Sequence, residues 1–362
     1  MSAARVEGPI RIGVIGAGGW GRNHIRVLKS LPEVELVGVS DRDPERRRAA
    51  ESEEGVRGFE DLAALARAGL DAITIAVPTP AHHAVALDAI ARGLHLLIEK
   101  PIASTIAEAD DILARARERA LVLSVGHVER WNPAFEAVKA RSRRPHFVEV
   151  HRLAPFNPRG TDVAVVLDLM IHDLDLVLAL VGRPVAAVDA VGVAVLSREI
   201  DIANARLEFE GGAIANVTTS RISLQKTRKI RVFEEDTYLS ADLVSRAVAC
   251  FRKRPAENDE ERIGDTPYRI EQEPVEVSME EPLTREMRAF AAAVRGEDSG
   301  FVTGEEGRAA LDVARRILDA IEKRRGALET ERDGERNDAR AREGAMRAFG
   351  AGGSPDAIGG TE

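Results

Sequence analysis

The sequence predicts an α/β protein with an N-terminal doubly wound parallel sheet and a C-terminal α/β domain built on a large open, mostly antiparallel sheet. Three observations predict this fold. Short apolar runs alternate with amphipathic helical stretches up to about residue 127, and a glycine-rich turn follows the first apolar run. Longer segments with alternating apolar and polar residues come after residue 127.

The first half of the chain repeats the order strand, helix, strand. Apolar runs of strand length occupy residues 11–16, 34–40, 71–78, 95–100 and 121–127, and helical patterns such as residues 108–120 separate them. Strands joined by helices form right-handed crossovers, which make neighbouring strands parallel. We therefore expect residues 1–127 to form one domain.

The second half has the texture of an antiparallel sheet. Residues 146–153, 185–196 and 200–222 read as longer strands, and Ala203, Ala205, Leu207 and Phe209 share one face. Glu210, Gly211 and Gly212 form a plausible hairpin turn within the last of them. Helical patterns at 282–296 and 305–323 end the second domain, expected to span 128–325. Residues 326–362 are rich in Arg, Glu, Asp and Gly and are expected to be a disordered tail.

Composition narrows the function classes. The 362 residues carry a net charge of −9, whereas nucleic-acid binding needs clustered lysine and arginine. A single cysteine, Cys250, excludes an internal disulfide and any CxxC site. Neither a signal peptide nor an apolar run of membrane-spanning length is visible, so we expect a cytoplasmic protein without a nucleic-acid or membrane partner.

The glycine-rich turn predicts a dinucleotide site. Gly16, Gly18 and Gly21 stand in G-x-G-x-x-G spacing between a strand and a helix, as in a Rossmann domain. Such glycines allow a tight turn, close approach to a pyrophosphate, and close packing of helix on strand. Asp41, which ends the next strand twenty residues later, would bind the ribose hydroxyls and repel a 2′-phosphate. This favours NAD as cofactor, and Arg42 beside it keeps NADP as an alternative.

Lys100 ends a predicted parallel strand in the sequence Glu99-Lys100-Pro101. Ligands of open α/β sheets bind outside the carboxyl ends of the strands. Pro101 restricts Lys100 to an extended conformation. A lysine beside a nicotinamide can exchange a proton with a substrate hydroxyl. A solvated loop lysine is the competing interpretation.

Residues 165–180 are apolar except for Asp168, His172, Asp173 and Asp175. In one α-helix, Asp168, His172 and Asp175 would share one face and Asp173 would point away. Buried charges need partners, so the alternatives are a paired structural network, a weakly supported metal site, and a histidine base held in its tautomer by Asp168. Of the eight histidines only His172 has carboxylates in helical register between apolar flanks, and we interpret it as the base.

Together these motifs resemble the Gfo/Idh/MocA family of NAD(P)-dependent sugar oxidoreductases over residues 10–325. The glycine loop, AVPTPAHH, EKP, GHVERWNP and the D-x-x-x-H of Asp168 and His172 occur in family order. The resemblance implies a Rossmann domain followed by an α/β domain whose open sheet often mediates dimers or tetramers. It also assigns catalytic roles to Lys100, Asp168 and His172.

A narrower resemblance connects the chain with UDP-N-acetylglucosamine 3-dehydrogenases. It rests on residues 151–178, 201–223 and 229–240. It implies NAD-dependent oxidation of the sugar 3-hydroxyl, and an aminotransferase that uses the 3-keto product to make a 3-amino sugar for lipid A. Oxidation of another sugar or of a UDP-hexosaminuronate, a redox-neutral reaction of an epimerase or glycosidase with bound NAD, and a non-catalytic NAD-responsive binding protein are the alternatives.

The expected site combines three groups of residues. His172 removes the hydroxyl proton, Asp168 orients His172, and Lys100 stabilises the alkoxide. The candidate cofactor-binding residues are Gly16, Gly18, Gly19, Trp20, Gly21, Asp41, Arg42, Val77, Pro78, Thr79, His82, Glu99, Lys100 and His127. The candidate substrate-binding residues, mainly cations for a diphosphate, are Arg130, Asn132, Arg152, Arg159, Asp175 and Arg221. No metal is expected.

Overall fold

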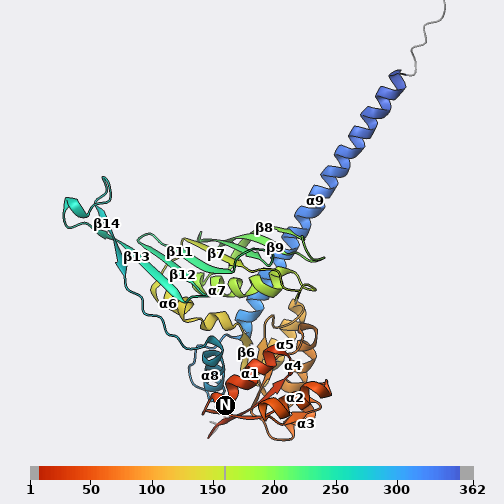
Figure 1. The fold of residues 1–362 in the computed structure, drawn as a ribbon, viewed down its shortest axis with the longest axis vertical. Helices are drawn as coiled ribbons and strands as arrows, with labels where there is room; N and C mark the ends of the chain where they lie inside the picture. Colours follow the sequence, from red (N-terminus) through yellow and green to blue (C-terminus); the bar gives the residue numbers. More distant parts are fainter. Residues whose placement is uncertain (1–7, 159, 351–362) are drawn as a thin grey trace, which may run out of the picture.

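The computed structural model describes residues 8–158 and 160–350, with the side chains of the last helix described to Ala327 and at Thr330. It shows two sheets, one in each half of the chain, with helices between and beside them (Figure 1). The predicted α/β class is confirmed. Among the described residues, no helix combines the length and apolar character needed to cross a bilayer.

The first sheet is parallel and has six strands in the order β3-β2-β1-β4-β5-β6. Its central strands β1 and β4 are apolar except for Arg11 and Thr74, and every residue in them except Arg11 is buried, as expected of parallel strands covered by helices on both faces. The strands are β1 (Ile10–Ile15), β2 (Val34–Ser40), β3 (Gly58–Phe59), β4 (Ala72–Ile75), β5 (His95–Glu99) and β6 (Leu123–Gly126).

Helices with well-defined ends cover this sheet. They are α1 (Gly19–Ser30), α2 (Pro44–Glu54), α3 (Leu62–Ala66), α4 (His82–Ala91) and α5 (Ile106–Glu118), with short 3-10 turns η1 (Thr79–Ala81) and η2 (Val128–Trp131). Helix α5 begins with a capping box, in which Thr105 and Glu108 each bond the other's backbone N–H. Because each of these helices follows a parallel strand in the chain, each begins on the side of the sheet where the strands end, and the predicted site residues lie on that side.

The second sheet has eight strands in the order β14-β13-β12-β11-β7-β10-β9-β8, antiparallel except between β7 and β10. The alternation expected in residues 203–209 is confirmed, because Ala203, Ala205, Leu207 and Phe209 are buried while the residues between them are exposed. The strands are β7 (Phe147–Leu153), β8 (Val185–Val193), β9 (Ile202–Phe209), β10 (Ile214–Ser220), β11 (Thr227–Phe233), β12 (Thr237–Asp242), β13 (Ala247–Pro255) and β14 (Tyr268–Glu273).

One face of this sheet packs on α6 (Pro133–Arg141), α7 (Ile171–Val181) and the first turns of α9 (Gly304–Gly350). Met170, Leu174 and Val177 meet Val148, Val217 and Ile230 of the strands in one buried cluster. The buried helices lie on the side of the sheet that faces the first domain (Figure 1). Residues 165–180 are therefore placed where the two domains meet.

The chain then returns to the first domain. Helix α8 (Pro282–Val294) inserts Leu283, Met287 and Phe290 into the same cluster as Ile12 of β1 and Ile25 of α1. Ser124 of β6 and Thr303 form an antiparallel bridge just before α9. Residues of α8 and Thr303 thus pack on the first domain, although they follow the second sheet in the sequence.

Helix α9 runs past α5, α7 and β8 and then projects away from the body of the molecule (Figure 1). It has 47 residues, about 70 Å at the α-helical rise. A disordered tail was expected from residue 326, but the backbone is helical to Gly350. Residues 351–362 of that tail lie outside the described residues.

Candidate active site

The glycine loop between β1 and α1 has the stereochemistry that a bound pyrophosphate requires. Gly16 has φ +98°, and a Cβ there would lie 2.6 Å from the carbonyl oxygen of Ala76. A Cβ on Gly21 would lie 1.8 Å from the carbonyl oxygen of Gly16. A Cβ on Gly18 would meet only Arg46 Nη1, at 3.8 Å, and one on Gly19 would meet nothing within 4 Å. The first and third glycines therefore close the turn, and the second leaves room for a phosphate group.

Asp41 connects this loop to the carboxyl end of β2. Its side chain is 10% exposed and accepts hydrogen bonds from the backbone N–H of Ala17 at 2.7 Å and of Asp43 at 2.9 Å. Each carboxylate oxygen keeps a second lone pair for a ribose hydroxyl. A cavity of about 450 Å³ opens here. Its lining includes Gly16, Gly18, Asp41, Arg42, Arg46, Val77 and Pro78. The residues present thus fit the adenosine half of NAD.

Two other predicted cofactor residues make internal hydrogen bonds. The His82 ring lies 2.9 Å from the carbonyl oxygens of both Val77 and Pro101, which ties two loops at the strand ends together. Glu99 Oε1 lies 2.9 Å from His24 Nε2, whose ring also reaches Thr74 at 3.1 Å. These side chains fix the shape of the sheet edge. His24 itself is completely buried.

Lys100 extends from the end of β5 into the space between the domains. Its ammonium lies 2.5 Å from the backbone oxygen of Asp168 and 3.6 Å from Asp168 Oδ1. Burial lowers the pKa of Lys100, and the Asp168 carboxylate opposes that shift. A cavity of about 240 Å³ is lined by Lys100 and Asp168 together with Thr79, Gly160 and Arg315. Lys100 and Asp168 thus share one enclosure, although they are 68 residues apart.

The segment 165–180 is not the single α-helix that its apolar pattern predicts. Residues Val166–Met170 form a π-helical turn, and α7 begins at Ile171. A π-turn contains one extra residue, so it rotates Asp168 away from the face expected from a period of 3.6. Asp168 bonds Lys100, and no hydrogen bond joins it to His172 among the described residues. The expectation that Asp168 orients His172 is therefore corrected.

The other two carboxylates of this segment are neutralised by arginines. Asp175 receives two hydrogen bonds from Arg130, at 2.5 and 2.9 Å. Asp173, expected to point away, is 1% exposed and receives two from Arg152, both at 2.8 Å. Bidentate pairs of this kind are the usual way to bury a carboxylate. The interpretation of a satisfied ionic network is thus correct for Asp173 and Asp175.

His172 is the unpaired member of the segment. It is 9% exposed, and its Nδ1 is buried without a hydrogen-bond partner among the described residues. The ring of His127 meets it edge to face, with centroids 6.4 Å apart. Burial, and then the positive charges of Lys100 and Arg152, hold the pKa of His172 well below 6.5. His172 is therefore a neutral imidazole, able to accept a proton, and the charge of Lys100 contributes to keeping it neutral.

The arginines predicted to bind a diphosphate have protein partners. Arg130 also pairs with Glu306 at 2.8 Å, and Arg152 with Glu129 at 3.1 Å. Arg221 pairs with Asp201 at 2.8 Å and donates to the carbonyl oxygen of Gly160 at 2.7 Å. These partners lie far apart in sequence, and no sequence pattern reveals them.

Two substrate candidates remain, Asn132 and Arg159. Asn132 caps α6 by accepting from the N–H of Ala134 at 3.1 Å, and it donates to the carbonyl oxygen of Leu243 at 3.0 Å. Arg159 lies outside the described residues. Sequence reasoning missed Glu129 and Arg228, which pair at 2.6 Å beside Arg152. The one sequence feature that could have indicated this pair is the charged residue Glu129 within the GHVERWNP motif.

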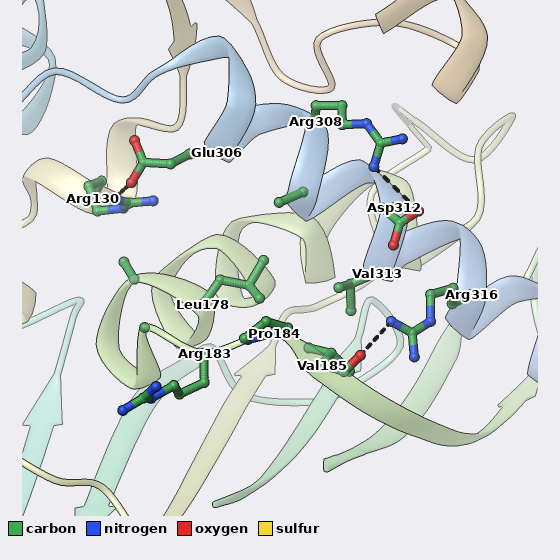
Figure 2. Close-up of a pocket in the computed structure, with 13 residues that line it drawn as sticks. Arg130, Leu178, Arg183, Pro184, Val185, Glu306, Arg308, Asp312, Val313 and Arg316 are labelled. Carbon is green, nitrogen blue, oxygen red and sulfur yellow. Dashed lines mark hydrogen bonds and ion pairs between the residues drawn. The ribbon is translucent and has the colours of Figure 1, made fainter. Parts of the chain in front are cut away.

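A second cavity of about 450 Å³ lies between the end of α7 and α9 (Figure 2). Arg130, Arg308 and Arg316 reach it, but each is held by the protein. Arg308 lies 3.7 Å from Asp312, and Arg316 donates to the carbonyl oxygen of Val185 at 2.9 Å. Neither Lys100 nor His172 lines it. Among the side chains that the structure describes, no group of three or more His, Cys, Asp or Glu residues could hold a metal ion.

Comparisons with known proteins agree with this geometry. Residues 10–127 match the family described as "Oxidoreductase family, NAD-binding Rossmann fold", and residues 136–239 match the "GFO/IDH/MocA C-terminal domain". UDP-N-acetylglucosamine 3-dehydrogenase of Acidithiobacillus ferrooxidans is 36% identical over 314 residues, covering 86% of this chain and 97% of that protein.

Solved structures show the same fold. A crystal form of the A. ferrooxidans enzyme, GnnA, superposes with a TM-score of 0.79 at 35% identity, over 87% of this chain and 98% of that one. The WlbA dehydrogenase of Bordetella pertussis, solved with NADH and UDP-GlcNAcA, superposes with a TM-score of 0.73 at 21% identity. That alignment covers 88% of this chain and 96% of WlbA.

Proposed function

Because this chain belongs to the Gfo/Idh/MocA family of NAD-binding oxidoreductases, we propose that it oxidises the 3-hydroxyl of UDP-N-acetylglucosamine to the 3-keto sugar nucleotide, with NAD as the acceptor. The observation that supports the proposal is the contact between Lys100, at the carboxyl end of β5 in the sheet that bears the cofactor cavity, and Asp168, in the π-turn that leads into His172. The near full-length similarity to a UDP-N-acetylglucosamine 3-dehydrogenase supports the choice of substrate.

NAD, when bound, supplies the acceptor for the hydride that leaves carbon 3 of the sugar. The protein must take the hydroxyl proton and stabilise negative charge on the oxygen. Neutral His172 accepts the proton, and the Lys100 ammonium donates a hydrogen bond to the developing alkoxide. Asp168 serves this chemistry through Lys100, since its backbone oxygen and carboxylate hold the ammonium in place.

The decisive experiment incubates the protein with NAD and UDP-N-acetylglucosamine and follows the absorbance of the reduced cofactor. An aminotransferase or another ketone trap is included, because ketone formation is unfavourable without removal of the product. UDP-hexosaminuronate and free N-acetylglucosamine serve as comparison substrates. Faster reduction with either of these, or retention of bound cofactor with conversion of the sugar and no NADH, would contradict the proposal.

The finer parts of the proposal concern the setting of the reaction. The 3-keto product is the substrate that an aminotransferase needs to form a 3-amino sugar, and we assign this product to synthesis of a lipid A type glycolipid. We place the enzyme in the cytoplasm, in keeping with its single free thiol, Cys250. Fractionation of a cell extract tests the cytoplasmic location. A coupled assay with the aminotransferase tests whether the 3-keto product is converted to a 3-amino sugar.

We also propose a homo-oligomer that uses the outer face of the second sheet. Four aromatic rings cross this face, one each on β7, β11, β12 and β13: Phe147, Phe233, Tyr238 and Phe251. Neighbouring ring centroids are 4.8–6.0 Å apart. Such a row of partly exposed aromatics is typical of an interface core. Light scattering of the wild type and of Tyr238→Glu tests it, and a monomeric wild type would refute it.

A further inference from the structure

A cleft of about 340 Å³ lies between the two domains, separate from the cavities described above. Helix α1 contributes Trp20 and Arg26, the segment at the start of β11 contributes Lys226 and Arg228, and the turn after β12 contributes Arg246. We call these five residues, together with Glu129 and Glu281, the interdomain cleft. It adjoins the proposed catalytic residues, because Arg228 pairs with Glu129, which pairs with Arg152 beside His172.

The charges of the interdomain cleft do not balance. Four cations face two carboxylates, in a protein whose net charge is −9. Glu129 is shared by Arg152 and Arg228, and Glu281 is held by Arg26 through hydrogen bonds of 2.5 and 3.0 Å. Among the described residues no carboxylate pairs with Lys226 or Arg246, although Arg246 donates to the carbonyl oxygens of Met279 at 2.7 Å and Glu280 at 3.3 Å. Two positive charges are therefore left without a carboxylate.

Trp20 adds an aromatic surface to this cationic site. Its side chain is 45% exposed, which is unusual for a tryptophan, and it lines the interdomain cleft. It is absent from the lining of the cavity that contains Asp41. An exposed indole beside uncompensated cations matches a ligand with a planar base and phosphate groups.

We propose that the interdomain cleft binds the nucleoside diphosphate half of the substrate, with Lys226, Arg228 and Arg246 on the diphosphate and Trp20 against the base. This assignment rests on the proposed function and extends it. The diphosphate of a nucleotide sugar carries two negative charges, which equals the uncompensated charge of the cleft. The arginines expected from the sequence, Arg130, Arg152 and Arg221, are already paired with buried carboxylates.

Binding is measured with UDP alone, through the emission of the two tryptophans, Trp20 and Trp131. UDP should quench the emission of the wild type, and Trp20→Phe should lose the quench. Lys226→Ala should weaken UDP binding about tenfold, and Lys226→Glu more, since each loses a charge-assisted contact. Lys229→Ala is the matched control, because Lys229 lies exposed on the opposite face of β11 from the buried Ile230.

Turnover separates this inference from the function it rests on. With UDP-N-acetylglucosamine, Lys226→Ala should raise KM about tenfold and leave kcat within about twofold, because a contact to the diphosphate stabilises the bound substrate and the transition state equally. If the wild-type protein turns over the substrate, and both Lys226 variants keep its KM and its affinity for UDP, the cleft assignment alone is overturned. A wild type that binds UDP in the cleft but oxidises no nucleotide sugar would overturn the proposed function alone. Quenching that persists in Trp20→Phe would overturn the role of Trp20.

Discussion

Lys100 is held between two opposing influences. Burial lowers its pKa, whereas the Asp168 carboxylate at 3.6 Å favours the charged ammonium. Asp168 is itself 33% exposed, so it faces the cavity as well as the lysine. We therefore propose that Asp168 acts on the reaction through the protonation state of Lys100.

Replacing Asp168 with Asn should lower the pKa of Lys100 further, because the attraction to a negative charge is lost. The alkaline limb of the kcat profile that reports the ammonium should then move to lower pH, while the affinity for NADH stays unchanged. Rates measured across the pH range test this for both proteins. An alkaline limb at the wild-type position would show that Asp168 does not tune Lys100.

His172 should act as a base down to unusually low pH. Its pKa is depressed well below 6.5 by burial and by nearby cations, so its acid limb in kcat/KM should also lie well below pH 6.5. His172→Asn should lower kcat by about 10²–10⁴. Affinity for NADH, from fluorescence titration, serves as the control for folding and should change less than twofold. Full activity of the variant would refute the role.

Glu286 on α8 predicts a pH effect on stability that is unrelated to turnover. It is 2% exposed, and neither carboxyl oxygen has a partner among the described residues. Burial, then the charges of Glu99 and Asp175, raise its pKa well above 4.5. In the unfolded chain Glu286 ionises near its ordinary pKa, whereas in the folded protein it keeps its proton. Its contribution to stability is therefore lost as pH rises above about 4.5 and toward the folded-state pKa.

Glu286→Gln should consequently raise the Tm relative to wild type, and the gain should be larger at pH 8 than at pH 5. Thermal unfolding followed by circular dichroism at both values measures it. Glu297→Gln, an exposed change three residues beyond the end of α8, should alter the Tm at neither pH. Equal Tm values for Glu286→Gln and wild type at pH 8 would mean that Glu286 is ionised in the folded protein.

Among the elements, β7 and α7 are joined by a buried ion pair whose loss should be costly. Arg152 is 3% exposed and lies between Asp173 and Glu129. Arg152→Met would leave the buried Asp173 carboxylate without a cation and Glu129 with Arg228 alone, at a cost of about 3–5 kcal/mol in the free energy of unfolding. Urea denaturation measures it. Arg231→Met, which removes the partly exposed pair with Glu149, should cost about 0–1 kcal/mol.

The sequence predicted the helices, strands and turns better than the directions and partners of their side chains. The glycine loop and the hairpin at Gly211 depend on local patterns, and both are found at the predicted place. Strand ends were predicted less well: the strands expected at 71–78 and 121–127 are only Ala72–Ile75 and Leu123–Gly126. The face presented by Asp168 depends on one π-turn, which the period of apolar residues does not encode. The partner of Arg130, Asp175, is 45 residues away and was itself predicted to bind substrate. Pairings of this kind follow from packing of the whole chain.

For the whole molecule, α9 divides into a packed part and a projecting part. Its buried side chains, such as Leu311, Ile317 and Ile321, come before residue 322 in the described portion. Ending the chain after Ala327 should therefore leave the Tm and turnover unchanged. Ile317→Ala, within the packed part, should cost about 2–5 kcal/mol. A large loss of Tm on truncation would show that the projecting part also stabilises the fold.

The return of α8 to the first domain has a consequence for dissecting the protein. A fragment ending at Gly126 would lack Leu283, Met287 and Phe290, and would expose to water the apolar surface on Ile12 and Ile25 that they cover. The hydrophobic core of the first domain is thus completed by a segment from the C-terminal part of the chain. A soluble nucleotide-binding piece would have to receive residues 282–303 in trans or through a circularly permuted linker.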